Sequence, residues 1–354
     1  MARVAGVLGM GTAAAVAAAL LAAGCGSSWK LRTATTDVAL QWPYQPNAAK
    51  VTFVRSLSGL ERRKTAGGAL KSAVIGREAS DRHAFVLPVA VAMGADGRLA
   101  VADMGRRSVH LYLPAQERYL ELTGPDADRI VSPVGVFFDE GLDLYVSDSA
   151  GRVLAFGPGG ELRFVIKSAG GEPLRRPTGL AYSPTRKLLY VVDTLANKVH
   201  AFSREGAVAF SFGERGDAPG RFNFPTHIFR SAAGELFVTD ALNFRVEIFD
   251  EDGKVLGTFG RHGDGSGDLA MPKGVAADRD GVVYVVDGIF DNVQLFSKSG
   301  DFLLTLGRRG VDFGEFWLPT GVFLSESDEL YVCDTYNRRI QVFRIAVGYA
   351  QGRG

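Results

Sequence analysis

Six aspartates recur at nearly equal spacing, and each one ends a run rich in Leu, Tyr and Val. They are Asp103, Asp148, Asp193, Asp240, Asp287 and Asp334, at intervals of 45, 45, 47, 47 and 47 residues. A catalytic carboxylate is needed once or twice in a site, whereas a carboxylate that accepts backbone N–H groups of a following turn is useful in every repeat. We therefore predict that these six aspartates are structural.

Histidines are the next candidates, because several imidazoles together can hold a catalytic metal. The chain has five of them, His83, His110, His200, His227 and His262. Apart from His110 and His200, they fall at different positions relative to the aspartates, which argues against a multi-histidine site. We expect no metal ion and no other cofactor.

The elements that must position these residues follow from a second series in the same register. Prolines followed by apolar alternation recur at Pro88, Pro133, Pro177, Pro225, Pro272 and Pro319. Each unit holds four short apolar runs separated by Gly, Asp, Asn and Ser, which is the pattern of one propeller blade. The sequence therefore predicts an all-β, six-bladed β-propeller of four-stranded antiparallel blades over residues 50–345.

The units resemble the NHL repeat, whose pattern runs Pro-x-Gly-apolar, Leu-Tyr-Val-x-Asp, Asn-x-Arg-Val and Phe. Residues 240–246 and 334–340 match best, and unit two departs most, with a shortened turn after Asp148. WD repeats are excluded because the chain has no Trp-Asp dipeptide. In this family, function resides in face residues that differ between blades.

The last unit ends after its third strand, which leaves blade six incomplete. We predict that an N-terminal strand at residues 50–55 closes the ring as the outermost strand of that blade, because closure removes exposed edges. Residues 69–75 have the composition of a short helix over one face. Cys333 lies within a strand pattern, so we predict a buried thiol.

The N-terminus has the features of an export signal. Arg3 precedes an apolar run, and small residues lead to Cys25. This resembles a bacterial lipobox and implies a signal peptide over 1–24, a lipid on Cys25 and a polar tether over 25–49, with a tail at 346–354. An uncleaved membrane anchor is the alternative. Gly26, rather than aspartate, after the cysteine implies the outer membrane rather than the inner.

The net charge is +1, so no global field favours nucleic acid or anionic membrane. Some NHL propellers bind RNA through a basic face. A protein exported by this signal does not meet cytoplasmic RNA, so we expect no nucleic acid partner. We expect a protein or envelope polymer to bind the face that carries the aspartate turns, and the lipid to hold the chain at the membrane. Arg106, Arg107 and Arg338 are the candidate ligand residues there.

Two further candidates belong to the central channel. His227 replaces the glycine of Pro-x-Gly in unit four, and Lys273 follows the proline of unit five. Adjacent blades would bring the two together at the channel, where they could hold a small acidic ligand. Ordinary drift of the repeat explains them equally.

Related six-bladed propellers include enzymes, so a metal-dependent hydrolase or lyase of the gluconolactonase type is the alternative function. A similar lyase binds metal through histidines that begin several inner strands, whereas none of the corresponding residues is histidine here: Val89, Val134, Thr178, Thr226, Lys273 and Thr320. Gluconolactonase-like propellers use acidic and amide groups, but Asp139 and Asp278 are predicted at the far ends of their strands. We favour a non-enzymatic binding platform.

Overall fold

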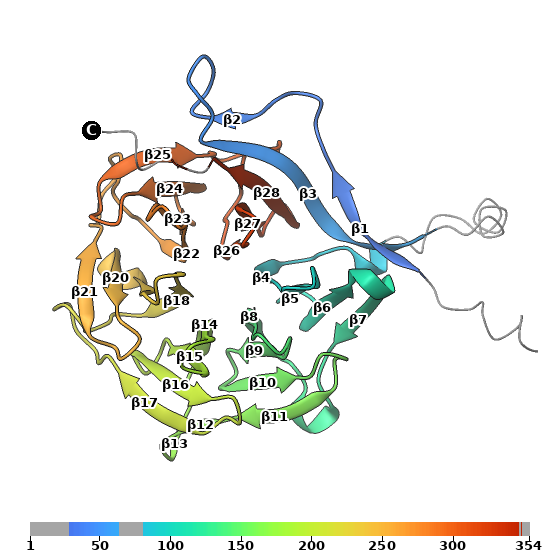
Figure 1. Cartoon of the computed structure of the whole chain (residues 1–354), viewed down its shortest axis with the longest axis vertical. Coiled ribbons are helices and arrows are strands. Elements are labelled where there is room, and N and C mark those ends of the chain that lie inside the picture. Colours follow the sequence, from blue (N-terminus) through green and yellow to red (C-terminus); the bar gives the residue numbers. More distant parts are fainter. Residues whose placement is uncertain (1–27, 64–80, 347, 349–354) are drawn as a thin grey trace, which may run out of the picture.

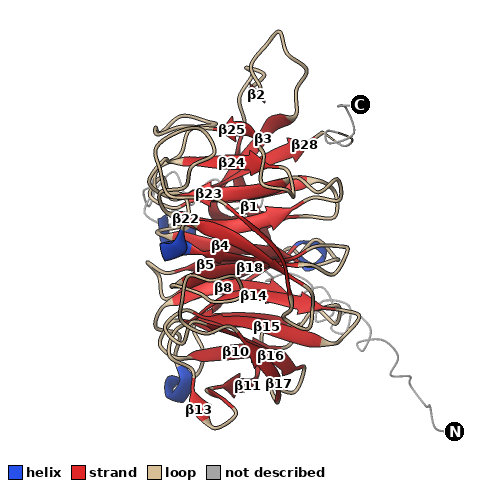
Figure 2. Cartoon of the chain, turned by 90° about the vertical axis from the view of Figure 1, so that its left-hand side faces the viewer, coloured by secondary structure: helices blue, strands red, loops and turns tan. Residues whose placement is uncertain are grey.

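A computed structural model describes residues 28–63, 81–346 and 348. Six sheets stand around a central axis like the blades of a propeller (Figure 1). Viewed from the side, the strands of the sheets form one layer with loops on both faces (Figure 2). The predicted all-β, six-bladed propeller is confirmed.

Blades one to three each have four antiparallel strands, numbered outward from the channel. Blade one holds β4 (Pro88–Met93), β5 (Leu99–Asp103), β6 (Ser108–Leu113) and β7 (Arg118–Leu122). Blade two holds β8 (Pro133–Phe138), β9 (Leu144–Asp148), β10 (Arg152–Phe156) and β11 (Leu162–Ile166). Blade three holds β14 (Pro177–Ser183), β15 (Leu188–Asp193), β16 (Lys198–Ser203) and β17 (Val208–Phe212).

Blades four to six follow the same order. Blade four holds β18 (Pro225–Arg230), β19 (Leu236–Asp240), β20 (Arg245–Phe249) and β21 (Val255–Phe259). Blade five holds β22 (Pro272–Ala277), β23 (Val283–Asp287), β24 (Asn292–Phe296) and β25 (Phe302–Leu306). Blade six contributes β26 (Val322–Leu324), β27 (Glu329–Asp334) and β28 (Arg339–Ile345).

Few elements lie outside the blades. A small hairpin, β12 (Ser168–Ala169) and β13 (Glu172–Pro173), joins blades two and three. The described helices are single 3₁₀ turns at Asp81–His83, Pro114–Gln116, Asp126–Asp128 and Ala241–Asn243. Within the described residues, no helix has both the length and the apolar character required to cross a bilayer.

The ring closes as predicted, through β3 (Val51–Arg62), which pairs antiparallel with β28 as the fourth strand of blade six. The expected tether is corrected in part. β1 (Trp29–Ala34) adds a further strand outside β3, and β2 (Gln41–Trp42) also pairs with β3. The Trp42 ring is buried and packs 5.7 Å from the ring of Phe343, so this segment belongs to the fold.

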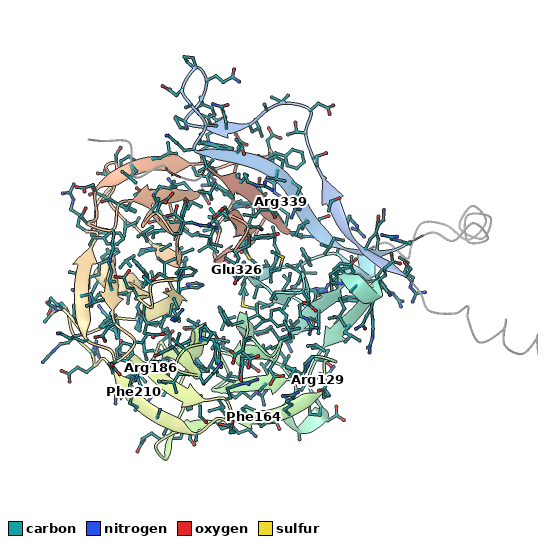
Figure 3. The ribbon with its side chains drawn as sticks, in the orientation of Figure 1. Arg129, Phe164, Arg186, Phe210, Glu326 and Arg339 are labelled. Carbon is teal, nitrogen blue, oxygen red and sulfur yellow. The ribbon has the colours of Figure 1, made fainter. Side chains whose placement is uncertain are left out.

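The core lies between neighbouring blades, where side chains fill the space from both sides (Figure 3). Second strands such as β9 and β23 are buried at every position, because both faces of each blade are covered. The inner strands approach closely: a Cβ on Gly321 would lie 2.3 Å from the Val89 carbonyl oxygen of the next blade. The glycine of Pro-x-Gly is therefore required by packing in this blade.

Three sequence predictions concern other segments. Cys333 is a fully buried free thiol, as predicted, and burial raises its pKa. Cys25 and the predicted helix at residues 69–75 lie outside the described residues.

Candidate binding face

The six aspartates hold the turns on one face of the ring. All are buried, with exposures of 1% or less. Asp103 accepts the backbone N–H groups of Val86 at 2.7 Å and Leu87 at 3.0 Å, which begin the same blade. Asp287 accepts those of Ala270 and Ile289, at 2.8 and 2.9 Å. Each carboxylate thus ties the turn between strands two and three to the chain that enters the blade, and we call this surface the turn face.

Arginines five residues after two of these aspartates hold the connecting loops. The Arg339 Nε donates to Asp334 at 2.7 Å, and its Nη2 donates to the carbonyl oxygens of Asp312 and Glu315. Arg245 does the same in blade four, donating to Asp240 and to the preceding loop. These arginines therefore fasten the chain between blades.

The fifth residue of the turn, counting the aspartate as the first, has a positive φ in most blades. Asn197 and Asp291, with φ of 54° and 51°, use this position structurally. Their side-chain oxygens accept the backbone N–H groups of Phe224 and Leu318, which enter the next blade. Asn and Asp are also the residue types that tolerate this conformation best.

Arg107 and Arg338 occupy the same position with φ of 56° each. Both side chains are exposed, and neither makes a hydrogen bond or ion pair with another described residue. Blades one and six are neighbours in the ring, so the two arginines flank one junction. Arg106, beside them, is half-buried and donates from Nε to the Ala84 carbonyl oxygen at 2.8 Å.

Exposed apolar side chains gather on the same turns. Four of them stand two residues after the aspartate, where a turn is expected to be polar: Leu195, Leu242, Ile289 and Tyr336, at 48, 52, 57 and 50% exposure. Trp317, 40% exposed, packs beside Tyr336 with tilted rings whose centroids are 5.6 Å apart. These residues are not among the predicted site residues, although the apolar residue at a fixed turn position is a visible signal in the sequence.

Comparison with known proteins identifies the repeat. A family model described as the NHL repeat matches residues 316–343, which include the Asp334 turn and its Arg339. The chain is an NHL-repeat β-propeller. A search of curated proteins finds no match to the sequence.

Solved structures share the architecture of this NHL propeller. Virginiamycin B lyase from Staphylococcus aureus is 11% identical with a TM-score of 0.54, over 74% of this chain and 96% of that chain. A gluconolactonase from Xanthomonas campestris is 15% identical with a TM-score of 0.56, over 74% of this chain and 87% of that chain. At such identities the likeness shows the fold alone.

The two channel candidates lie on neighbouring inner strands of the propeller. His227 Nδ1 accepts the Val275 N–H at 3.3 Å, and the Thr226 hydroxyl donates to the Lys273 carbonyl oxygen at 3.3 Å. The His227 side chain is half-buried, and burial lowers its pKa to about 4. Burial, with Arg176 nearby, also lowers the pKa of Lys273. Binding of a small acidic ligand here stays a prediction.

The channel residues do not fit a metal ion. The Thr320 hydroxyl donates to the Val89 carbonyl oxygen at 3.1 Å, and the Thr194 hydroxyl donates to the Pro225 carbonyl oxygen at 2.7 Å, so these hydroxyls join neighbouring blades. Lys273 adds a cation among them. In residues 28–63 and 81–346, no three His, Cys, Asp or Glu side chains are grouped closely enough to hold a metal.

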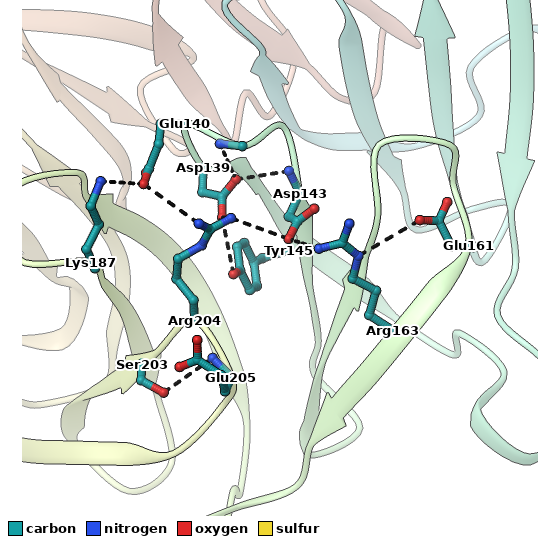
Figure 4. A network of polar contacts seen from close by, with 11 residues as sticks. Asp139, Glu140, Asp143, Tyr145, Glu161, Arg163, Lys187, Ser203, Arg204 and Glu205 are labelled. Carbon is teal, nitrogen blue, oxygen red and sulfur yellow. Dashed lines mark hydrogen bonds and ion pairs between the residues drawn. The ribbon is translucent and has the colours of Figure 1, made fainter.

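The inner-strand acids lie on the opposite face, as structural groups. Asp139 of blade two accepts Arg204 Nε of blade three at 2.9 Å, and Arg204 also reaches Asp143 (Figure 4). Burial and the neighbouring Asp139 raise the pKa of Asp143. Asp278 accepts the Tyr284 hydroxyl at 2.9 Å in blade five. These acids hold blades and turns together.

Proposed function

We propose that this NHL propeller is a lipid-anchored extracytoplasmic protein that binds a protein partner through its turn face. The observation that carries the proposal is the set of exposed apolar side chains on that face, above all Leu195, Leu242, Ile289 and Tyr336. Scattered exposed apolar residues are ordinary, but a set repeated at one turn position around the ring is the kind of patch that marks an interaction site.

The accompanying arginines support a protein partner over an envelope polymer. Protein interfaces are enriched in Tyr, Trp, Met and Arg, and hot spots concentrate in Tyr, Trp and Arg. Tyr336, Trp317, Arg338 and Arg107 supply that composition across the junction of blades one and six. Arg107 and Arg338 have a left-handed backbone conformation, and their side chains make no hydrogen bond or ion pair with another described residue that would stabilise the fold. They therefore fit a role in binding. The cations favour an acidic surface on the partner.

The lipid on Cys25 supplies the location in this proposal. Two or three acyl chains anchor stably where one binds marginally, since each buried methylene contributes about 0.8 kcal/mol. Gly26 after the cysteine favours the outer membrane. An exported protein does not meet cytoplasmic RNA, so the basic residues are assigned to an envelope partner.

Photo-crosslinking from the turn face tests the proposal. A photoreactive residue at Leu242 should form adducts with a protein in living cells, whereas one at Leu256 should not. The two leucines make a matched pair, because both belong to blade four and are 52 and 51% exposed, but Leu256 lies on the outermost strand. Arg107→Glu and Arg338→Glu should weaken the adduct.

Equal adducts from both leucines, or none from Leu242, would contradict the proposal. An adduct with polysaccharide would replace the protein partner with an envelope polymer.

The second candidate is a metal-dependent hydrolase or lyase, which the shared architecture with virginiamycin B lyase and gluconolactonase favours. It requires a divalent metal that copurifies with the full-length protein. Elemental analysis at a metal-to-protein ratio near one would move the assignment to this class.

A further inference from the structure

The connecting loop before blade three is shorter than those before blades four to six. In the longer loops, a fully buried anchor residue lies ten positions after the last residue of the fourth strand: Phe222 after Phe212, Leu269 after Phe259, and Phe316 after Leu306. Before blade three, the buried Leu174 lies eight positions after Ile166. Two residues of loop are therefore missing before blade three, as they are before blade two, where the buried Ile130 lies eight residues after Leu122.

The loop before blade six is held by two side chains of that blade. In blade six, Arg339 donates to the carbonyl oxygens of Asp312 and Glu315. Gln341 accepts the Gly314 N–H at 2.8 Å and donates to the Glu315 carbonyl oxygen at 2.6 Å. The propeller thus recognises the main chain of a short peptide segment at this place.

In blade three the equivalent residues are Lys198, which is exposed, and His200, which is buried. A cavity of about 330 Å³ opens there instead. We call it the blade-three slot; its lining includes Glu172, Arg175, Asp193, Lys198 and His200. Its volume lies at the lower end of the range of about 300–1,000 Å³ found for binding pockets.

In the slot, His200 and Asp193 already have partners within the protein, whereas the two cations form no ion pair in the part of the chain that the structure describes. His200 is 7% exposed, and its Nδ1 bonds to the Ser211 hydroxyl at 2.7 Å while its Nε2 lies 3.9 Å from Asp193. Asp193 is already occupied by the backbone N–H groups of Arg175 and Arg176, both at 2.8 Å. Arg175 and Lys198 form no ion pair with any described residue.

We propose that the blade-three slot binds a short acidic loop of the protein partner, in the place that the propeller's own loops fill in blades four to six. This deepens the proposed function and rests on it. Lys198 donates to main-chain carbonyl oxygens of the bound loop, as Arg339 does in blade six. His200 contacts the loop where Gln341 does, and Arg175 attracts an acidic side chain. Leu195, on the same turn, adds apolar contact beside the slot.

The probe for this proposal is the peptide acetyl-Val-Asp-Phe-Gly-Glu-amide, which copies residues 311–315 of the blade-six loop. Fluorescence anisotropy of the labelled peptide is measured against the full-length protein in detergent micelles. We expect saturable binding that Lys198→Ala weakens by roughly fivefold or more, as for the loss of a charged hydrogen bond. A peptide with both acids replaced by lysine should bind weaker by a similar factor.

Two further variants separate binding from folding. His200→Gln, which installs the residue of blades five and six, should retain the affinity, whereas His200→Leu should lose it. Lys187→Ala is the matched control: Lys187 lies in the same blade on the opposite face and pairs with Glu140. Thermal unfolding of each variant shows that the propeller is intact.

An affinity of Lys198→Ala within twofold of the parent, or equal binding of the lysine peptide, would overturn the proposal. If the peptide fails to bind while crosslinks from Leu242 persist, the slot is rejected and the proposed function stands. If the peptide binds as expected but Leu242 forms no adduct, the turn face is not the partner surface and the proposed function fails.

Discussion

Removing the buried carboxylate of Asp334 should destabilise the propeller more than replacing any exposed side chain of the turn face. Asp334 is fully buried and accepts the Trp317 N–H at 2.8 Å, Arg339 Nε at 2.7 Å and Gln341 Nε2 at 2.9 Å. Asp334→Ala leaves these donors, and the Asn337 Nδ2 that also bonds to the carboxylate, without this acceptor. Arg339 is the costly one, because its side chain is only 11% exposed.

The magnitude follows from the buried charge. Breaking a buried ion pair by removing one partner costs about 3–5 kcal/mol, since the other charge stays desolvated. Arg339 keeps its bonds to loop carbonyl oxygens, so we expect about 3 kcal/mol for Asp334→Ala. Combining it with Arg339→Met should cost less than the sum of the single losses, by about 1 kcal/mol or more.

Urea unfolding measures these changes, with tryptophan fluorescence and far-UV circular dichroism followed together to check that one transition is observed. Asp264→Ala is the control, because Asp264 is exposed on a connecting loop, and it should change stability by less than about 0.5 kcal/mol. A loss below about 1 kcal/mol for Asp334→Ala, or strict additivity with Arg339→Met, would refute the reasoning.

Three other outcomes are expected. Gly321→Ala places a methyl group 2.3 Å from a carbonyl oxygen of the next blade and should cost about 1–3 kcal/mol in thermal unfolding; Gly257→Ala, whose nearest neighbour lies 3.9 Å away, should be neutral. Burial raises the pKa of Glu329, but hydrogen bonds from Arg55 and its neighbours outweigh this and hold it low. Glu329 therefore stabilises above its unfolded pKa of about 4.3, and the stability difference from Glu329→Gln should shrink as the pH falls below that value in urea titrations. Cys25→Ser should abolish incorporation of labelled fatty acid and release the protein from membranes, and retention of the label would contradict the lipid anchor.

The prediction of the fold succeeded because each blade repeats the same physical demands. A buried aspartate must cap every second strand, and a proline begins the inner strand of blades one to five and shortly precedes that of blade six, so both appear in sequence at one register. The closing strand was predictable as well, because an incomplete last blade needs a partner for its edge.

The N-terminal segment was harder to read. Residues 25–49 look like a polar tether with Pro43 and Pro46, yet Trp29 and Trp42 are buried against the ring. Neither tryptophan belongs to a periodic pattern. Their burial depends on surfaces of blades one and six, far away in the sequence.

The sequence by itself determined the role of the repeated residues, including the six aspartates by which the repeat was recognised. It could do so because a local turn and its cap depend on neighbours in the chain. Only the tertiary structure decided which face residues are left over. Asn197 and Asp291 are used between blades, Arg107 and Arg338 are not, and a loop two residues short leaves Lys198 beside a cavity. These differences arise from contacts between blades, and spacing along one chain does not report what a neighbouring blade already occupies.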